Sequence, residues 1–332
     1  MPKADAVFEG GGVKGIALVG ALQAFEEAGF EWENVAGTSA GAITAALVAV
    51  GYKAHEVKDI MEKRINFSKF MDSSGIEKLP KIGPIIDLIT GQGMFKGDYF
   101  LGLMRELIEE KKKNKHVTFK DLLEPKHPED SDVDYETKYK YKLRVIASDI
   151  TGKRMLTLPQ DIDTLGGDPD DLEVATAVRM SMSIPFFFKP VRFGEGAHRN
   201  KKHWIVDGGM LSNFPIWLFD SSGEGAPEWP TIGFLLWEAG SGQPQYQKID
   251  GLISMAKGIV ETLSGAIDRM TLREIDLDRV VKIPTRDIAG TDFNLTDEIR
   301  EWLYNSGYEA AKEFLSTWTF DEYRRKRTGV AA

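Results

Sequence analysis

The fold is decided by residues 6–51, which read AVFEGGGVKGIALVGALQAFEEAGFEWENVAGTSAGAITAALVAVG. Residues 6–8 form an apolar run typical of a buried strand, and a glycine-rich turn follows at residues 10–15. Residues 16–28 carry apolar side chains at helical spacing, and Gly29 ends this pattern as a glycine C-cap does. The stretch therefore begins with a strand, a turn and a helix.

The same order is repeated immediately. A second strand is expected around Val35 and Ala36, a second glycine turn occupies residues 37–41, and a helix of small residues runs over 42–50 until Gly51 stops it. Consecutive strand–helix units of this kind are typical of a parallel sheet with helices on its faces. We therefore predict an α/β fold, arranged as three α/β/α layers around a mostly parallel central sheet.

The remainder of the chain supplies further elements, with no visible repeat and no linker between independent domains. We expect strands at residues 141–149, 204–206, 232–237 and 279–283, and helices at 99–113, 172–183, 252–276 and 297–317. Asp170 and Asp171 are candidate caps of one of these helices. Residues 53–135 are less regular and include a polar, acidic loop over 125–135, so this region is expected to be an insertion or lid. Residues 5–332 are expected to form one domain.

The composition excludes several classes of protein. The 332 residues are 42% hydrophobic and 28% charged, which is ordinary for a globular protein and excludes wholesale disorder. There is no cysteine, so disulfides, thiolate zinc sites and cysteine nucleophiles are excluded. The net charge of −9 argues against nucleic acid as a partner. Two basic runs, 111–113 and 324–327, are better interpreted as solvated helix ends than as contacts with anionic lipid headgroups.

No segment has the features of a targeting or membrane-spanning sequence. The N-terminal residues lack the apolar core of a signal peptide. The longest uncharged, mostly apolar run, residues 37–52, is shorter than the roughly 20 residues that a spanning helix needs. We therefore expect a cytoplasmic protein, with peripheral contact to a membrane left open.

The second glycine turn, Gly37-Thr38-Ser39-Ala40-Gly41, has the pattern G-x-S-x-G between a strand and a helix. A nucleophilic serine at such a turn has a strained backbone, and small residues on both sides let strand and helix approach closely. The helix N-terminus behind the serine favours developing negative charge. The alternative is a helix-capping serine flanked by glycines, and the position of the turn favours the nucleophile.

The first glycine turn allows two interpretations. Gly10, Gly12 and Gly15 satisfy G-x-G-x-x-G, and Glu31 and Glu33 lie about as far along the chain as the acid of a dinucleotide fingerprint, roughly 20 residues on. That acid belongs at the end of the second strand, whereas both glutamates precede the expected strand. In the other interpretation, the glycines present backbone N–H groups that stabilise an oxyanion.

The third turn, Asp207-Gly208-Gly209, follows the expected strand at residues 204–206. An aspartate there can act as a general base, although an Asp-Gly surface turn is the commoner meaning of the pattern. Histidine is the usual base beside a serine nucleophile, but none of the five lies in a loop after a late strand. We interpret all five as surface or structural residues, the least certain being the last: His55, His116, His127, His198 and His203.

Taken in order, these segments resemble the patatin-like phospholipase family. The resemblance rests on residues 10–15 (GGGVKG), 37–41 (GTSAG), 181–190 (SMSIPFFFKP), 207–209 (DGG) and 213–215 (NFP), and it spans most of residues 5–237. It implies a serine–aspartate dyad without histidine, in which Ser39 is the nucleophile and Asp207 its base. Burial beside the serine should raise the pKa of Asp207 above its ordinary value of about 3.9.

The resemblance also assigns roles to the glycine turns. The oxyanion donors would be the backbone N–H groups of Gly11 and Gly12, joined by Gly10 or Val13. The remaining residues of the three turns would support the motif, with Lys14 where the family carries a basic residue: Lys14, Gly15, Gly37, Gly41, Gly208 and Gly209. No metal and no cofactor is implied.

The implied substrate is a phospholipid or another acyl-ester lipid, cleaved by a phospholipase A or lysophospholipase type of reaction through an acyl-serine. Three consecutive aromatic residues within 184–188 lie next to the expected site, and one of them could line an acyl groove. The apolar, glycine- and proline-rich residues 82–95 could form a lid that contacts lipid aggregates. The alternative function is a dinucleotide-binding protein that uses Gly10–Gly15.

Overall fold

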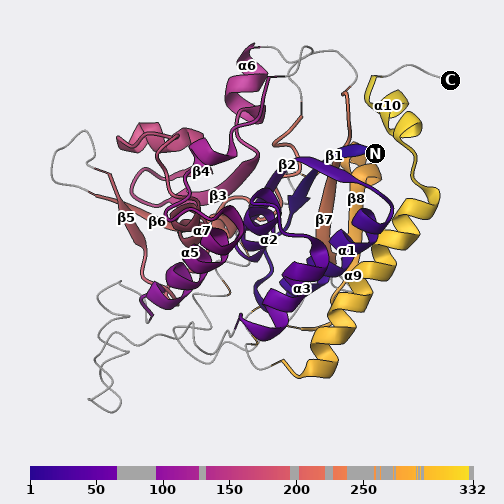
Figure 1. The fold of residues 1–332 in the computed structure, drawn as a ribbon, viewed down its shortest axis with the longest axis horizontal. Helices are drawn as coiled ribbons and strands as arrows, with labels where there is room; N and C mark the ends of the chain where they lie inside the picture. The colour runs from indigo at the N-terminus through magenta and orange to yellow at the C-terminus, as the bar shows by residue number, and fades with distance from the viewer. Residues whose placement is uncertain are drawn as a thin grey trace.

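The protein is a mixed α/β structure with a mostly parallel central sheet flanked by helices, as the sequence predicts (Figure 1). The computed structural model describes residues 1–65, 95–126, 132–194, 202–220, 227–237, 274–288 and 295–328, together with 258, 262, 272, 290 and 292.

The sheet has the strand order β5-β6-β3-β2-β1-β7-β8, with β4 paired to β3 beside this path. The strands are β1 (Lys3–Phe8), β2 (Glu31–Thr38), β3 (Leu143–Asp149), β4 (Arg154–Leu158), β5 (Val191–Phe193), β6 (His203–Asp207), β7 (Thr231–Trp237) and β8 (Val280–Pro284). The five strands from β3 to β8 along this order run parallel, whereas β4, β5 and β6 pair antiparallel. The carboxyl ends of β1 and β2 therefore meet at one edge.

The helices of the described residues fall into two groups. The longer ones are α1 (Gly15–Glu27), α2 (Ala40–Ala49), α3 (Ala54–Lys63), α5 (Asp98–Lys112), α7 (Val174–Ser181), α9 (Asp297–Thr317) and α10 (Phe320–Thr328). The short ones are η1 (Gly12–Lys14), η3 (Phe119–Leu122), α6 (Asp132–Asp134), the π-helical η4 (Tyr135–Tyr139), η5 (Gln160–Leu165), η6 (Gly208–Met210) and η7 (Glu274–Arg279).

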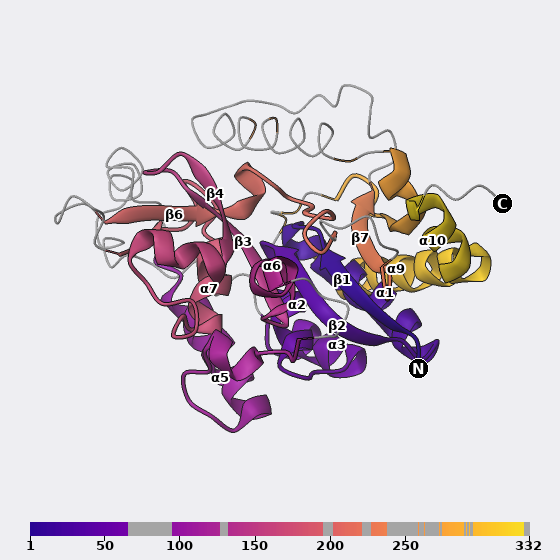
Figure 2. The same ribbon diagram turned by 90° about the horizontal axis from the view of Figure 1, so that it is seen from above.

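One face of the sheet carries the main hydrophobic core. Alternate residues of β1 and β2, such as Phe8 and Val35, point into this core, where α1, α2 and α3 cover the strands (Figure 2). Helices α1 and α9 cross very closely, because a Cβ on Gly20 would lie 1.9 Å from the carbonyl oxygen of Tyr304. Helix α9 therefore packs tightly on the helical layer.

The intervening residues of the same strands form a smaller core on the opposite face. Val7, Ala36 and Ile146 pack there against the segment that follows β6, including Phe214 and Phe219. The helix expected at residues 252–276 lies mostly outside the described residues. Of those described there, 258 and 262 are α-helical and 274–276 begin η7.

The less regular region of the sequence contributes to the main core. Val57 of α3, Leu107 of α5 and Phe119 of η3 are fully buried in it. The lid expected at residues 82–95 lies outside the described residues except for Phe95. None of the helices in the described part of the chain is both long and apolar enough to cross a membrane.

Two local predictions are wrong. The expected loop at 125–135 ends in α6 and the start of η4. Helix α7 begins at Val174 with Glu173 as its N-cap, so neither aspartate caps it. Asp170 instead accepts a hydrogen bond of 2.5 Å from the hydroxyl of Tyr141.

Candidate active site

The turn between β2 and α2 places Ser39 in a strained conformation. Its backbone angles are φ 53° and ψ −121°, a region that non-glycine residues adopt only at a cost of about 1–3 kcal/mol. The flanking glycines are required by space: a Cβ on Gly37 would lie 2.3 Å from the backbone of Gly41, and a Cβ on Gly41 would lie 2.3 Å from the carbonyl oxygen of Phe8. The structure therefore has the strand–turn–helix geometry in which a serine hydroxyl projects from a sheet edge.

Asp207 ends β6 and lies directly beside this serine. The hydroxyl of Ser39 donates a hydrogen bond of 2.8 Å to Oδ2 of Asp207, and Oδ1 of the same carboxylate accepts one of 2.7 Å from the N–H of Gly209. Both side chains are buried, with 6% of Ser39 and 5% of Asp207 exposed. The sulfur of Met182 lies 3.4 Å from Ser39 Oγ, on the side of α7.

Burial controls the protonation of Asp207. It raises the pKa of the carboxyl to about 7, and the hydrogen bonds from Gly209 and Ser39 oppose this shift only in part. A carboxyl with a pKa near neutrality is a far better proton acceptor than an ordinary aspartate. The pair can therefore deprotonate the serine hydroxyl as it attacks a carbonyl.

The backbone amides of the glycine loop after β1 differ in their hydrogen bonds within the described part of the chain. The N–H of Gly10 donates to the carbonyl oxygen of Asn213 at 3.1 Å, and that of Val13 donates to the carbonyl oxygen of Gly290 at 2.9 Å. The amides of Gly11 and Gly12 have no acceptor among the described residues. Of the four expected oxyanion donors, Gly10 and Val13 thus donate to acceptors within the protein.

Asn213 joins this loop to the aspartate turn. Its Nδ2 donates to the carbonyl oxygen of Gly10 at 2.9 Å and to Oε1 of Glu9 at 3.1 Å. A Cβ on Gly10 would lie 2.2 Å from Asn213 Oδ1, and a Cβ on Gly209 would lie 3.0 Å from it. Asn213 therefore lies between the two glycine turns and contacts both.

The other residues of the motifs also serve close packing. A Cβ on Gly208 would lie 2.3 Å from the carbonyl oxygen of Ile146, and a Cβ on Gly15 would lie 3.3 Å from the Cβ of Ala40. Lys14 is half-buried, and its N–H donates to the carbonyl oxygen of Gly11.

The acids of the dinucleotide alternative are misplaced. Glu31 and Glu33 lie in the first half of β2, and Glu33 forms an ion pair of 3.1 Å with Lys3 at the start of β1. A ribose-binding acid belongs at the other end of that strand, beside the glycine turn. The geometry of β2 therefore argues against a nucleotide site.

Histidine does not contact the serine–aspartate pair in the described residues. His203 is bonded to Asp149, with 2.8 Å between Nδ1 and Oδ2, at the far end of β6 from Asp207. His55 and His116 are exposed. His127 and His198 lie outside the described residues.

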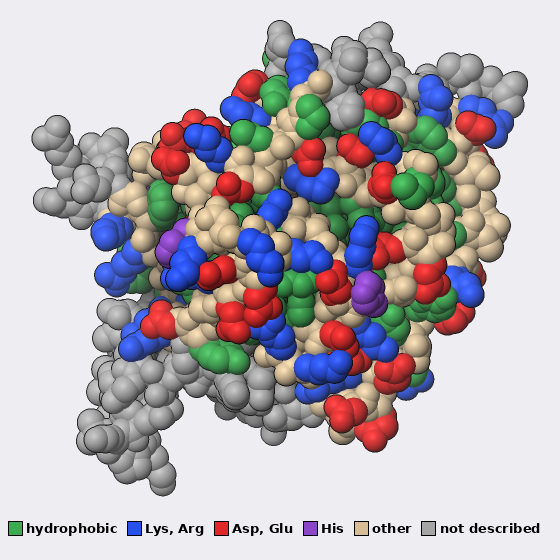
Figure 3. All heavy atoms as spheres, in the orientation of Figure 1, with side chains coloured by type: hydrophobic (Ala, Val, Ile, Leu, Met, Phe, Trp, Pro, Cys, Tyr) green, Lys and Arg blue, Asp and Glu red, His purple; other side chains and the backbone are tan. Residues whose placement is uncertain are grey.

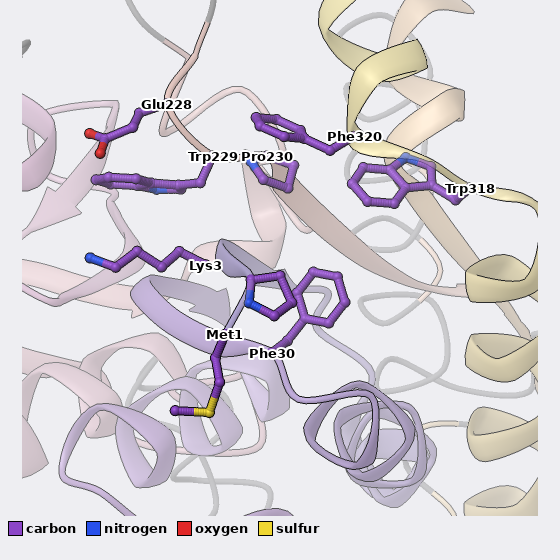
Figure 4. Close-up of a pocket in the computed structure, with 9 residues that line it drawn as sticks. Met1, Lys3, Phe30, Glu228, Trp229, Pro230, Trp318 and Phe320 are labelled. Atoms are coloured by element: carbon purple, nitrogen blue, oxygen red, sulfur yellow. The ribbon is translucent and has the colours of Figure 1, made fainter.

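A separate cavity of about 280 Å³ lies at the opposite end of the sheet (Figure 4). Its lining is mostly aromatic and apolar: Met1, Pro2, Lys3, Phe30, Glu228, Trp229, Pro230, Trp318 and Phe320. Lys3 begins β1, whereas the glycine loop follows the end of that strand. The length of β1 therefore separates this cavity from Ser39.

Comparisons with known proteins agree with this arrangement. Residues 6–220 match the family described as "Patatin-like phospholipase". The chain belongs to this family. It is 35% identical over 316 residues to "Uncharacterized protein YqhO" of Bacillus subtilis (strain 168), covering 95% of this chain and 99% of that relative.

More distant relatives of this patatin-like phospholipase include a viral protein and a solved structure. The chain is 25% identical over 210 residues to "Probable lipid hydrolase 463L" of Invertebrate iridescent virus 6, covering 63% of this chain and 61% of the relative. VipD from Legionella pneumophila shares the fold, with a TM-score of 0.53 at 20% identity over 95% of this chain and 67% of that one.

Sequence analysis did not assign roles to three neighbours of the pair. Ser181 Oγ accepts a hydrogen bond of 2.8 Å from the N–H of Ser39, and Met182 and Asn213 make the contacts described above. All three lie in segments that carry the family resemblance, but their partners are distant in sequence. Only the folded arrangement identifies them.

Proposed function

We propose that this chain is a lipid acyl hydrolase of the phospholipase A or lysophospholipase type, with Ser39 as nucleophile and Asp207 as its base. The observation that carries the proposal is the hydrogen bond of 2.8 Å between the two side chains at a strained strand-to-helix turn. The family and the name of the viral relative support a lipid as substrate. A cytoplasmic location and peripheral contact with a membrane are part of the same proposal.

The reaction proceeds in two halves. In the first, Asp207 takes the proton of Ser39 while Oγ attacks the ester carbonyl, and the amides of Gly11 and Gly12 stabilise the oxyanion. The tetrahedral intermediate then expels the alcohol, which receives the proton from Asp207, and an acyl-serine remains. In the second half, Asp207 takes a proton from water, which attacks the acyl-serine. The fatty acid leaves, and Asp207 returns its proton to Oγ of Ser39.

The test compares wild type with Ser39→Ala, Asp207→Asn and His203→Gln on p-nitrophenyl butyrate and on phospholipid vesicles. We expect the first two variants to lose at least about a hundredfold in kcat/KM, the order of a general base's contribution. His203→Gln should stay within about threefold of wild type, because His203 touches neither residue. A fluorophosphonate should label wild type and not Ser39→Ala.

Each half of the proposal has its own contrary result. Loss of activity in a folded His203→Gln protein would contradict a dyad without histidine. Ester hydrolysis and labelling that persist in Ser39→Ala would contradict the nucleophile. A wild-type protein that is labelled but cleaves no lipid would contradict the substrate class alone.

A further inference from the structure

The turn that follows α7 holds an exposed aromatic side chain in a strained conformation. Phe186 has φ 68°, in the left-handed region that bulky residues rarely adopt, and 41% of it is exposed. It belongs to neither hydrophobic core. Strain of this kind persists only where the surrounding structure fixes it, and it occurs preferentially at functional positions.

This turn is attached directly to the catalytic pair. Met182 contacts Ser39, and the carbonyl oxygen of Ser183 accepts a hydrogen bond of 2.9 Å from the N–H of Asp207. Phe186 follows only three residues later, so it lies within about 10 Å of that anchor along the chain. It is therefore part of the rim of the active site.

The neighbouring aromatic residues point inward and hold the turn. The ring of Phe187 lies 4.8 Å from the rings of both Phe95 and Phe188, and Phe188 is 2% exposed. The N–H of Phe95 donates to the carbonyl oxygen of Phe187, and that of Lys189 donates to the carbonyl oxygen of Phe95. Of the three consecutive phenylalanines, Phe186 alone is directed to solvent.

Two lysines follow the phenylalanines that hold this turn: Lys96 comes after Phe95, and Lys189 comes after Phe188. The carbonyl oxygens of Lys96 and Lys189 both accept hydrogen bonds from Nη2 of Arg179, at 2.6 and 2.9 Å, so the two residues lie side by side. Neither lysine forms an ion pair with any carboxylate of the described residues, including the nearby Asp98, which begins α5. Within the described part of the chain, no carboxylate therefore neutralises either charge.

Some other lysines of the described surface do form ion pairs. On the face in Figure 3, acidic and basic side chains are interspersed. In the two basic runs of the sequence, Lys111 pairs with Glu56 at 2.8 Å and Lys326 with Asp278 at 2.9 Å. Unlike Lys111 and Lys326, the side chains of Lys96 and Lys189 have no acidic partner among the described residues, in a chain with a net charge of −9.

We propose that Phe186, Lys96 and Lys189 dock the active site on the surface of an anionic phospholipid bilayer. An aromatic ring inserts at the boundary of headgroups and acyl chains, while neighbouring lysines bind lipid phosphates. The strained backbone keeps the ring outside the protein core and ready to insert. The inference rests on the proposed function, because docking at this rim brings Ser39 to ester bonds in the membrane.

The test is co-sedimentation of the full chain, carrying Ser39→Ala to prevent hydrolysis, with vesicles of phosphatidylglycerol and phosphatidylcholine or of phosphatidylcholine alone. Phe186→Ser and the double variant Lys96→Glu/Lys189→Glu should each weaken binding to the anionic vesicles by about tenfold or more. The matched controls are Leu123→Ser, another exposed apolar side chain, and Lys112→Glu/Lys115→Glu at the far end of α5. Both controls should bind within about twofold of the parent.

Several results would overturn the docking surface. The proposal is contradicted if the parent protein does not bind anionic vesicles. It is also contradicted if the docking variants bind as well as the controls. A loss of binding that Phe186→Leu does not restore would point to a damaged fold or to a protein partner instead of a bilayer. The melting temperatures of the docking variants should match that of the parent, which separates loss of docking from loss of the fold. Absence of ester hydrolysis in wild type contradicts the proposed function, and vesicle binding is judged separately.

Discussion

Ser39 Oγ lies 2.8 Å from Asp207 Oδ2, although 168 residues separate them in the chain. Strand β3 explains their proximity. In its pairing with β2, Ile146 is opposite Thr38, and in its pairing with β6, Ala147 is opposite Asp207. Two consecutive residues of one central strand therefore position the serine turn and the aspartate turn, and the dyad depends on the register of β3 with both neighbours.

The pH dependence of activity should report the pKa of Asp207. Burial raises this pKa to about 7, and the carboxyl must be deprotonated to accept the serine proton. We expect kcat/KM for p-nitrophenyl butyrate to rise with pH and to level off above about pH 8. The measurement is a pH–rate profile at constant ionic strength. A profile that is flat down to pH 5 would show that Asp207 titrates like an ordinary aspartate.

Because Asp207 is buried, its ionisation at high pH lowers the free energy of unfolding. The folded pKa, about 7, is above the ordinary value of 3.8, so the folded state binds the proton more tightly. The resulting stabilisation is complete below about pH 4 and is lost as pH rises through about 7. Asp207→Asn should therefore unfold less easily than wild type at pH 8, by at least about 1 kcal/mol, while being inactive.

Urea denaturation at two pH values checks this prediction. The side-chain oxygen of an asparagine can still accept the hydrogen bond from the N–H of Gly209, so this buried donor stays satisfied in the variant. At pH 5 the difference between variant and wild type should shrink, because Asp207 is then mostly protonated. A variant that is less stable than wild type at both pH values would contradict an energetic cost of the buried charge.

The sequence predicts the centre of the fold well and its edges poorly. The strands β1, β2, β3, β7 and β8 are mostly apolar runs, and each was expected close to its observed position. The strands β4 and β5 and helix α3 were missed. β4 and β5 are short and half-exposed, so their alternation is weak. Helix α3 does carry a helical pattern, with Ala54, Val57, Ile60 and Met61 on its buried face, and this pattern was overlooked within the less regular region.

The candidate site could be predicted only in part. The three glycine turns are visible in the sequence, but their contact is a property of sheet topology, so the pairing of Ser39 with Asp207 came from family resemblance. The sequence also could not predict which backbone N–H groups of the glycine loop lack an acceptor among the described residues. The N–H of Val13 donates to the carbonyl oxygen of Gly290, which is 277 residues further along the chain. The sequence around Gly290 has no motif that indicates this contact.

The close packing at the nucleophile turn predicts a large cost for a single methyl group. A Cβ on Gly41 would lie 2.3 Å from the carbonyl oxygen of Phe8 and 2.6 Å from that of Glu9. Gly41→Ala must separate α2 from β1, so we expect a loss of about 2–4 kcal/mol in the free energy of unfolding. Urea denaturation measures it.

Gly29→Ala is the matched control for this prediction. Gly29 has φ +84°, but a Cβ there meets nothing within 4 Å. The substitution should therefore cost only about 1–2 kcal/mol of backbone strain. If both alanine variants were equally stable, the clash at Gly41 would be relieved by a cheap local shift.

Asn213 should control the rate more than the stability. Its Nδ2 holds the carbonyl oxygen of Gly10, and its own carbonyl accepts the N–H of Gly10, so it fixes the start of the oxyanion loop relative to the aspartate turn. In Asn213→Ala we expect kcat to fall by about 10- to 100-fold, because small displacements of transition-state groups carry costs of that size. KM should change little, because Asn213 contacts the two glycine turns and does not belong to the docking surface formed by Phe186, Lys96 and Lys189.

The informative readout is affinity for a trifluoromethyl ketone, which forms a tetrahedral adduct with a serine. If Asn213 positions the oxyanion donors, affinity for this transition-state analogue should fall in proportion to kcat/KM across Asn213→Ala and Asn213→Asp. If Asn213 had a purely structural role, the variants would have a lower melting temperature, and their affinity for the analogue would not fall in proportion to kcat/KM. Full activity in a stable Asn213→Ala protein would show that the amides of Gly11 and Gly12 hold their positions without this clamp.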